Sequence, residues 1–168
     1  MIKINKKIEY ALMALKYMSQ RCANAKGEEQ TLELTSAREI CDKFHTPFDT
    51  TAKVLQLMNN QGILISTKGI KGGYSLAVPL SHVTFGQLAE IIEGKNKTGS
   101  FCQSAKGRCD LYENCNIVTP IDLLSKKVNE YLSSLSLEEL LLNEHANNLV
   151  SMVDSKNIKS EDKITELP

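Results

Sequence analysis

Residues 36–60 contain two short helical patterns that are separated by a single proline, Pro47. The first pattern opens with Ser36 and has Glu39 three residues later, which is the capping box of a helix N-terminus. Pro47 disfavours helical backbone in the residue before it, so the chain must turn between the two patterns. The second pattern covers residues 48–60. Two short helices joined by a tight turn are typical of a helix-turn-helix.

The segment after these helices predicts a β-hairpin. Gly62 is placed to end the second helix in a left-handed conformation. Residues 63–67 and 74–78 both favour strands, and the segment between them contains three glycines together with Lys68 and Lys71. A helix-turn-helix followed by such a hairpin is a winged helix. We therefore expect a mainly α-helical fold with a small β-hairpin wing.

Three further helical patterns surround this unit. Residues 6–20 are apolar on two faces, which indicates a central helix that contacts more than one neighbour. Residues 84–94 carry apolar side chains on one side. Residues 119–135 form a long helix with Thr119 as its predicted N-cap, and a second capping box at Ser136 begins a short helix after it.

The predicted long helix has an apolar stripe with a/d spacing over two heptads. The stripe comprises Ile121, Leu124, Val128, Tyr131 and Leu135. Such a seam needs a partner surface, and the same helix of a second chain is the simplest one. We therefore expect a homodimer through residues 119–135, against the alternative that this helix packs on residues 6–20 of its own chain.

Three of the five cysteines lie in the long segment 95–118, which has no periodic apolar pattern. They are Cys102, Cys109 and Cys115. Long loops of this kind in compact domains are usually functional or disordered. The cysteine intervals are wider than those of zinc knuckles, and thiolates also ligate iron–sulfur clusters. The segment predicts an iron–sulfur site, against the alternative of three unligated thiols.

The chain is neutral overall, but its charge is unevenly distributed. Residues 1–83 hold 11 Lys and Arg against 7 Asp and Glu, a net charge of +4, and the remaining residues carry −4. This asymmetry indicates an anionic partner for the first half, although a chance imbalance on a soluble surface gives the same numbers. No nucleophile–base pair, phosphate loop or carboxylate pair is visible, so we expect no enzyme.

The cysteines and the hydropathy also bear on the compartment. An odd number of cysteines without a signal peptide argues against a disulfide framework and indicates a cytoplasmic protein. No segment reaches the roughly 18 uninterrupted apolar residues of a membrane helix. Cys22 and Cys41 lie on or near predicted helices, where we expect small buried side chains.

The predicted winged helix contains a set of candidate DNA contacts, because the second helix of such a unit reads base edges with its N-terminal residues. The candidates on that helix are Asp49, Thr50, Thr51, Lys53 and Gln56. Lys68 and Lys71 at the wing tip are candidates for the minor groove, and Arg38 is a candidate for the phosphate backbone. The alternative is an ordinary solvated surface on a winged helix that binds another protein.

Several segments resemble the IscR/NsrR-type family of winged-helix iron–sulfur cluster transcription regulators. They are KIEYALMALKYM, STKGIKGGYSLA, VTFGQLAEIIEG and the triple-cysteine loop, in the family's order over about residues 1–145. Lys68 stands where the family commonly has Arg. The resemblance implies a homodimer that binds promoter DNA under the control of a cluster sensing redox poise, nitric oxide or iron–sulfur status. The alternative is a cluster-free regulator controlled by thiol oxidation or a protein partner.

The resemblance also implies a fourth cluster ligand that is not a cysteine. In one branch of the family it is a histidine three residues after the last cysteine, where this chain has Val118. In another branch it is an acidic residue in the first helix of the partner subunit, and Glu9 matches that position. The alternative for Glu9 is a salt bridge with Lys6 or Lys7. A [4Fe–4S] cluster is slightly favoured over a [2Fe–2S] cluster, which fits the same ligands.

The expected organisation has four parts. They are a winged-helix DNA-binding domain at 1–83, a helix and cluster-binding cysteine loop at 84–118, a dimerisation helix with a short capping helix at 119–145, and a polar C-terminal tail at 146–168.

Overall fold

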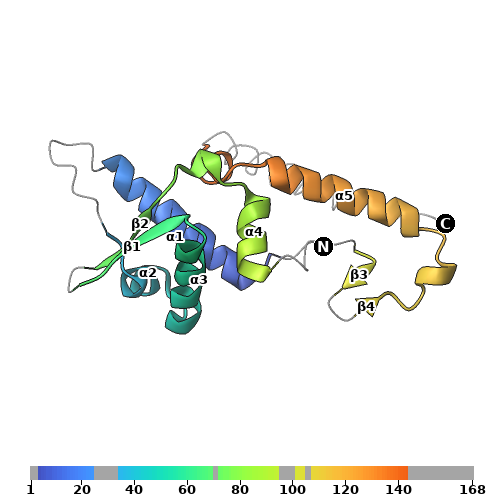
Figure 1. Ribbon diagram of the computed structural model, residues 1–168, viewed down its shortest axis with the longest axis horizontal. Coiled ribbons are helices and arrows are strands. Elements are labelled where there is room, and N and C mark those ends of the chain that lie inside the picture. Colours follow the sequence, from blue (N-terminus) through green and yellow to red (C-terminus); the bar gives the residue numbers. More distant parts are fainter. Residues whose placement is uncertain (1–3, 25–33, 70–71, 95–100, 105–106, 144–168) are drawn as a thin grey trace, which may run out of the picture.

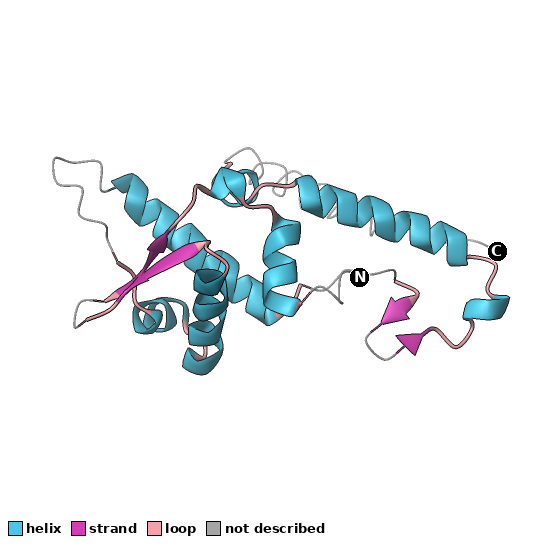
Figure 2. Cartoon of the chain, viewed as in Figure 1, coloured by secondary structure: helices cyan, strands magenta, loops and turns pink. Residues whose placement is uncertain are grey.

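The computed structural model describes residues 4–24, 34–69, 72–94, 101–104 and 107–143. The helices are α1 (Lys6–Asn24), α2 (Ala37–Phe44), α3 (Phe48–Asn60), α4 (Phe85–Glu93), α5 (Val118–Ser134) and α6 (Leu137–Leu142), with 3₁₀ turns η1 (Leu80–His82) and η3 (Tyr112–Asn114). The strands β1 (Leu64–Thr67) and β2 (Gly73–Leu76) form one antiparallel hairpin, and β3 (Gln103–Ser104) and β4 (Gly107–Arg108) form another (Figure 2). The predicted class, mainly helical with a small β-hairpin wing, is confirmed. Within the described ranges, no helix is both long enough and apolar enough to cross a membrane.

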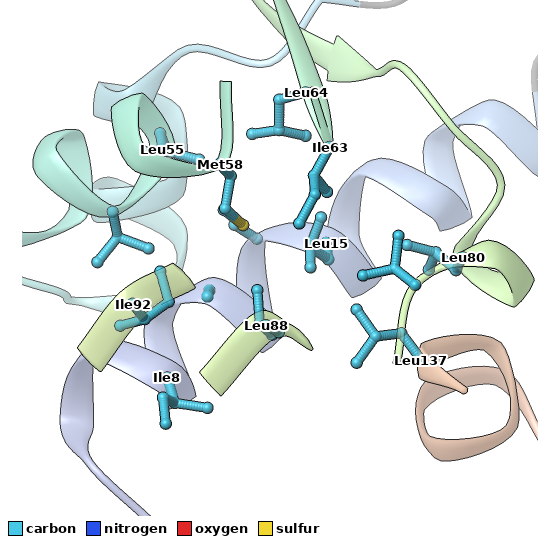
Figure 3. Close-up of a cluster of buried hydrophobic side chains, with 14 of the residues drawn as sticks. Ile8, Leu15, Leu55, Met58, Ile63, Leu64, Leu80, Leu88, Ile92 and Leu137 are labelled. Carbon is cyan, nitrogen blue, oxygen red and sulfur yellow. The ribbon is translucent and has the colours of Figure 1, made fainter. Parts of the chain in front are cut away.

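One hydrophobic cluster joins the winged helix to the elements that follow it in the chain. Its buried side chains come from α1, α2, α3, β1, η1, α4 and α6, and many of them are drawn in Figure 3. Helix α1 contacts α3, α4, β2 and α6, as expected for a central helix. Leu137 of α6 is completely buried and lies beside Leu80 of η1. The last short helix is therefore part of the same core as the helix-turn-helix.

Local chemical signals set the ends of several helices. Ser36, Thr84 and Ser136 each accept a hydrogen bond from the backbone N–H three residues later, which satisfies a donor of the first helical turn. After α3, the N–H groups of Gly62 and Ile63 donate to carbonyls of the last turn. Gly62 has a φ of +75°, so this end is the predicted left-handed cap, in the form of a Schellman motif.

Two predicted features of the C-terminal half are wrong. Thr119 is not the N-cap of the long helix, because Ile121 already donates to the carbonyl of Ile117 and α5 begins at Val118. The segment 95–118 is not a structureless loop, because it contains the β3–β4 hairpin and η3. Strands of two residues are too short to leave an alternating apolar pattern in the sequence.

Helix α5 leads away from the body of the protein (Figure 1). Its C-terminal end is held by a β-bridge between Thr84 and Ser136, with two flanking backbone hydrogen bonds of 2.8 Å. Gly86 lets α4 approach α5 closely, since a Cβ atom there would lie 3.0 Å from the Cα of Ser133. The other end of α5 carries the β3–β4 hairpin, which lies at the opposite end of the molecule from the wing β1–β2 (Figure 1).

We predict that Leu137→Ala lowers the free energy of unfolding by about 2–5 kcal/mol, because truncating a fully buried leucine leaves a cavity. Leu142→Ala is the matched control, since this side chain lies on the same helix and is 40% exposed. It should change the free energy of unfolding by about 0.5 kcal/mol or less. Urea unfolding followed by circular dichroism measures both values. Equal losses in the two variants would contradict the assignment of α6 to the core.

Candidate nucleic-acid interface and cysteine loop

Helix α3 presents a polar stripe to solvent on the face away from the core. Asp49, Lys53, Gln56 and Asn60 are exposed at positions i, i+4, i+7 and i+11, which form one helical face. Thr50 beside them is half-buried. The first three residues of the stripe and Thr50 belong to the predicted DNA contacts. Asn60 was missed, although the same periodicity identifies it.

Thr51 does not lie on this stripe, and its prediction as a DNA contact is wrong. Its side chain is 1% exposed, and its hydroxyl donates to the hydroxyl of Thr46 at 2.9 Å. Residues two apart on a helix do not share a face, so Thr51 points inward where Asp49 points outward. The bond to Thr46 fastens the first turn of α3 to the preceding turn, in which His45 has a left-handed φ of 54°.

Exposed residues on neighbouring elements extend the surface around α3. Arg38 lies in the first turn of α2, and Lys68 follows β1 in the wing; both are exposed. Lys71 lies outside the described residues. Phe48 is the first residue of α3 and is 51% exposed, which suits apolar contact with a thymine methyl group. It was missed because an aromatic residue at a helix start suggests a core position.

A polar cluster around Tyr17 joins α1 to α2. The Tyr17 hydroxyl donates to the carboxylate of Glu39 at 2.7 Å, and Arg21 forms a salt bridge with the same carboxylate. The hydrogen bond to Glu39 raises the pKa of Tyr17. The ammonium group of Lys43 lies 4.7 Å from the centre of the Tyr17 ring, a cation–π contact. These contacts hold α2, and with it Arg38, in a defined orientation on α1.

Cys102 and Cys109 face each other across the β3–β4 hairpin. The strand register pairs Gln103 with Arg108, and the N–H of Cys109 donates to the carbonyl of Cys102 at 3.1 Å. This bond extends the ladder by one pair, and directly opposed residues place their side chains on the same face. The six residues between the two cysteines thus form a short hairpin, which was not predicted from the sequence.

Cys115 lies on the same loop, after η3 and three residues before α5, and is half-buried. Within the described part of the chain, no three His, Cys, Asp or Glu side chains already form a metal-binding group. The structure therefore brings Cys102 and Cys109 together but does not add Cys115 to them. The donor chemistry still fits an iron–sulfur cluster, because all three residues carry thiols rather than disulfides.

Glu9 lies in the first turn of α1 and is not grouped with the cysteines of its own chain. Its carboxylate accepts a hydrogen bond from the ammonium group of Lys6 at 2.6 Å, and this bond raises the pKa of Lys6. The Glu9 side chain is 32% exposed, so it is accessible to another molecule. Of the two remaining cysteines, Cys41 is half-buried, whereas Cys22 is exposed, contrary to expectation.

Comparison with known proteins identifies relatives over most of the chain. The family model Rrf2, described as an iron-dependent transcriptional regulator, matches residues 4–143. The transcriptional regulator NsrR of Oceanobacillus iheyensis is 22% identical over 143 residues, which cover 85% of this chain and 92% of NsrR.

Solved structures share the fold. CymR, the global cysteine regulator of B. subtilis, aligns with a TM-score of 0.57 and 23% identity, covering 84% of this chain and 97% of CymR. IscR of T. potens aligns with a TM-score of 0.55 and 20% identity, covering 83% of this chain and 86% of IscR. The winged-helix architecture and the resemblance to IscR/NsrR-type proteins are confirmed, and these relatives are regulators rather than enzymes. The chain belongs to the Rrf2 family of transcriptional regulators.

Proposed function

We propose that this regulator binds promoter DNA under the control of an iron–sulfur cluster held by Cys102, Cys109 and Cys115. The observation that carries the proposal is the opposed placement of Cys102 and Cys109, with a third thiol on the same loop. Thiolates are the usual ligands of such clusters, and the family model is described as iron-dependent. The cluster would respond to redox poise, nitric oxide or iron–sulfur supply, with [4Fe–4S] slightly favoured over [2Fe–2S].

The proposed fourth ligand is Glu9 of the partner subunit. The chain's own Glu9 is on α1, and within the described residues it forms no metal-binding group with its own cysteine loop. A carboxylate is a harder ligand than a thiolate and holds iron more weakly. One edge of the cluster would then be exchangeable, which suits a sensor.

The proposed dimer interface is the exposed apolar face of α5. Leu124 and Tyr131 are 49% and 62% exposed and lie seven residues apart, so they occupy the same face. The other members of the predicted stripe are half-buried: Ile121, Val128 and Leu135. Within its own chain α5 packs on α4. An exposed apolar face on a helix that extends from the body favours a second copy as its partner (Figure 1).

The second candidate function is control by thiol oxidation without a cluster. Two cysteines opposed across a hairpin can form a disulfide when an oxidant removes two electrons and two protons. The opposed placement of Cys102 and Cys109 therefore favours this candidate as well. A structure of Staphylococcus aureus CymR in an oxidized form is among the neighbours, with a TM-score of 0.56 and 20% identity.

We predict that Lys53→Ala weakens binding to every DNA sequence and lowers the slope of log K against log salt by about 1 per subunit, because one phosphate contact is lost. Gln56→Ala should instead cost about 1–3 kcal/mol at one base position and relax specificity there. Fluorescence anisotropy with a promoter fragment and a scrambled duplex at several salt concentrations separates these effects. Lys126→Ala, on α5, should change neither. A salt slope unaffected by Lys53→Ala, together with unchanged specificity in Gln56→Ala, would remove α3 from the interface.

We predict that anaerobically purified protein contains iron and acid-labile sulfide and absorbs visible light. Replacing any one of Cys102, Cys109 and Cys115 by Ser should remove most of the iron, because each supplies a ligand. Cys22→Ser is the control and should retain the parent iron content. A parent protein without iron and sulfide would rule out the cluster and leave thiol oxidation as the mechanism.

The same preparations separate the two roles of Glu9. Glu9→Ala should shorten the lifetime of the cluster in the presence of a chelator by about tenfold or more, a loss on the scale of metal-site variants. Lys6→Ala removes the ion pair but leaves the Glu9 carboxylate in place, so its cluster should persist as in the parent. If the two variants lose the cluster equally fast, Glu9 acts through the ion pair and is not a ligand.

We predict that Leu124→Glu weakens the dimer by about tenfold or more, because a side chain worth about 1.5–3 kcal/mol of apolar burial is replaced by a charge. Sedimentation velocity over a range of protein concentrations measures the dissociation constant. Lys126→Glu introduces the same residue at a 73% exposed side chain, at the f position opposite the stripe, and should leave the dimer intact. Equal dissociation constants for Leu124→Glu and the parent would place the interface elsewhere.

A further inference from the structure

Ser125 of α5 is buried at the point where the cysteine loop meets this helix, and only 3% of it is exposed. Its hydroxyl donates to the carbonyl of Ile121 at 2.8 Å and accepts from the backbone N–H of Phe101 at 2.9 Å. A serine hydroxyl has one proton and two lone pairs, so both bonds form together. Phe101 directly precedes Cys102, and the second bond therefore fastens the beginning of the cysteine hairpin to α5.

Further hydrogen bonds continue from this anchor into the loop. The carbonyl of Cys102 accepts from Cys109 at 3.1 Å, and the carbonyl of Cys109 accepts from Tyr112 at 3.0 Å. Phe101 is 52% exposed, so burial of this residue contributes little to holding the strand. The Ser125 hydroxyl thus connects α5 to the backbone of two predicted ligands through one short network.

We propose that Ser125 is a positioning residue of the cysteine loop, which holds the Cys102 strand on α5 and couples the state of the thiols to that helix. A serine inside a helix that bonds only to the carbonyl four residues earlier slightly destabilises the helix. The additional hydrogen bond from Phe101 is therefore the contact by which Ser125 stabilises the structure. Alanine is the best helix former and would preserve α5 while removing both bonds. The N–H of Phe101 would then lose its protein acceptor.

The proposal deepens the proposed function, because positioning matters most if the loop holds a cluster. The hydrogen bond itself belongs to the metal-free chain. The role of Ser125 can therefore be measured on reduced protein without iron.

The test compares Ser125→Ala with Ser134→Ala. Ser134 lies on the same helix and donates to the carbonyl of Tyr131 at 2.9 Å, but it is exposed, which makes it the matched control. Amide hydrogen exchange at Phe101, followed by NMR, should be about five- to tenfold faster in Ser125→Ala, the factor that corresponds to one lost hydrogen bond. Ser134→Ala should leave it unchanged, and Ser125→Thr, which retains the hydroxyl, should restore the parent rate.

Thiol alkylation resolved by mass spectrometry gives a second readout. The rate at Cys102 relative to the exposed Cys22 should rise in Ser125→Ala by a similar factor, about five- to tenfold. An unchanged exchange rate at Phe101 overturns the proposal. A uniform rise in alkylation at Cys22, Cys41 and Cys102 does so too, because it reports general destabilisation. Failure of Ser125→Thr to restore the parent rates also counts against it, since the effect then does not depend on the hydroxyl.

Measurements on protein that contains the cluster distinguish the role of Ser125 from the presence of the cluster. If the parent holds a cluster, Ser125→Ala should shorten the lifetime of the cluster in chelator, and Ser134→Ala should not. A parent chain that binds no iron and sulfide refutes the cluster, whereas the exchange rate at Phe101 still decides the role of Ser125.

Discussion

A one-residue backbone bridge between Thr84 and Ser136 holds the long helix on the rest of the protein. Both residues are also N-caps, of α4 and α6 respectively. An N-cap residue has extended backbone, which is the geometry that a β-bridge needs, so the two caps can pair as a minimal antiparallel sheet. The flanking bonds, from Phe85 to Leu135 and from Leu137 to Val83, are both 2.8 Å long. The starts of α4 and α6 and the junction between them thus depend on the same few backbone groups.

This junction attaches the C-terminal end of α5 firmly to the winged helix. Leu137, next to the bridge, is part of the common core, and Gly86 leaves the space that the hydroxyl and Cα of Ser133 on α5 need beside α4. Helix α5 has 17 residues and spans about 25 Å at 1.5 Å per residue. The cysteine hairpin and the wing therefore lie at opposite ends of the molecule (Figure 1). Within one chain, α5 is therefore a route by which the thiols could act on α3. The proposed ligand Glu9 of the partner subunit would provide a second route, because α1 packs on α3.

Features with a local chemical signature were predictable from the sequence. The N-cap at Ser36 and the glycine end of α3 at Gly62 depend on residues within one helical turn, and both are confirmed. Of the capping box predicted at Ser36 only the serine half is confirmed, since the Glu39 carboxylate bonds Tyr17 and Arg21. Features that depend on remote contacts were not predictable. The β3–β4 hairpin has strands too short for a period. The burial of Thr51, by contrast, was predictable, because Thr51 lies three, four and seven residues before the buried Val54, Leu55 and Met58 on one helical face. The hydrogen bond of Ser125 joins it to Phe101, 24 residues away, and no local sequence pattern predicts such a contact.

The packing of α3 limits how the cysteine loop can act on DNA. Val54, Leu55 and Met58 are buried in the common core, so a local rearrangement of α3 would cost several kcal/mol, on the order of one lost core side chain. On the outer face of α5, Leu124 and Tyr131 are 49% and 62% exposed among the described residues, so this face has no comparable packing there. In a dimer joined through that face, a small shift of α5 changes the spacing and angle of two intact winged helices. Because DNA half-sites recur at about 34–36 Å, such a change of pose alters affinity without unfolding either core. If the cluster controls such a dimer, as proposed above, control would act on the relative pose of the two α3 helices and not on the shape of either one.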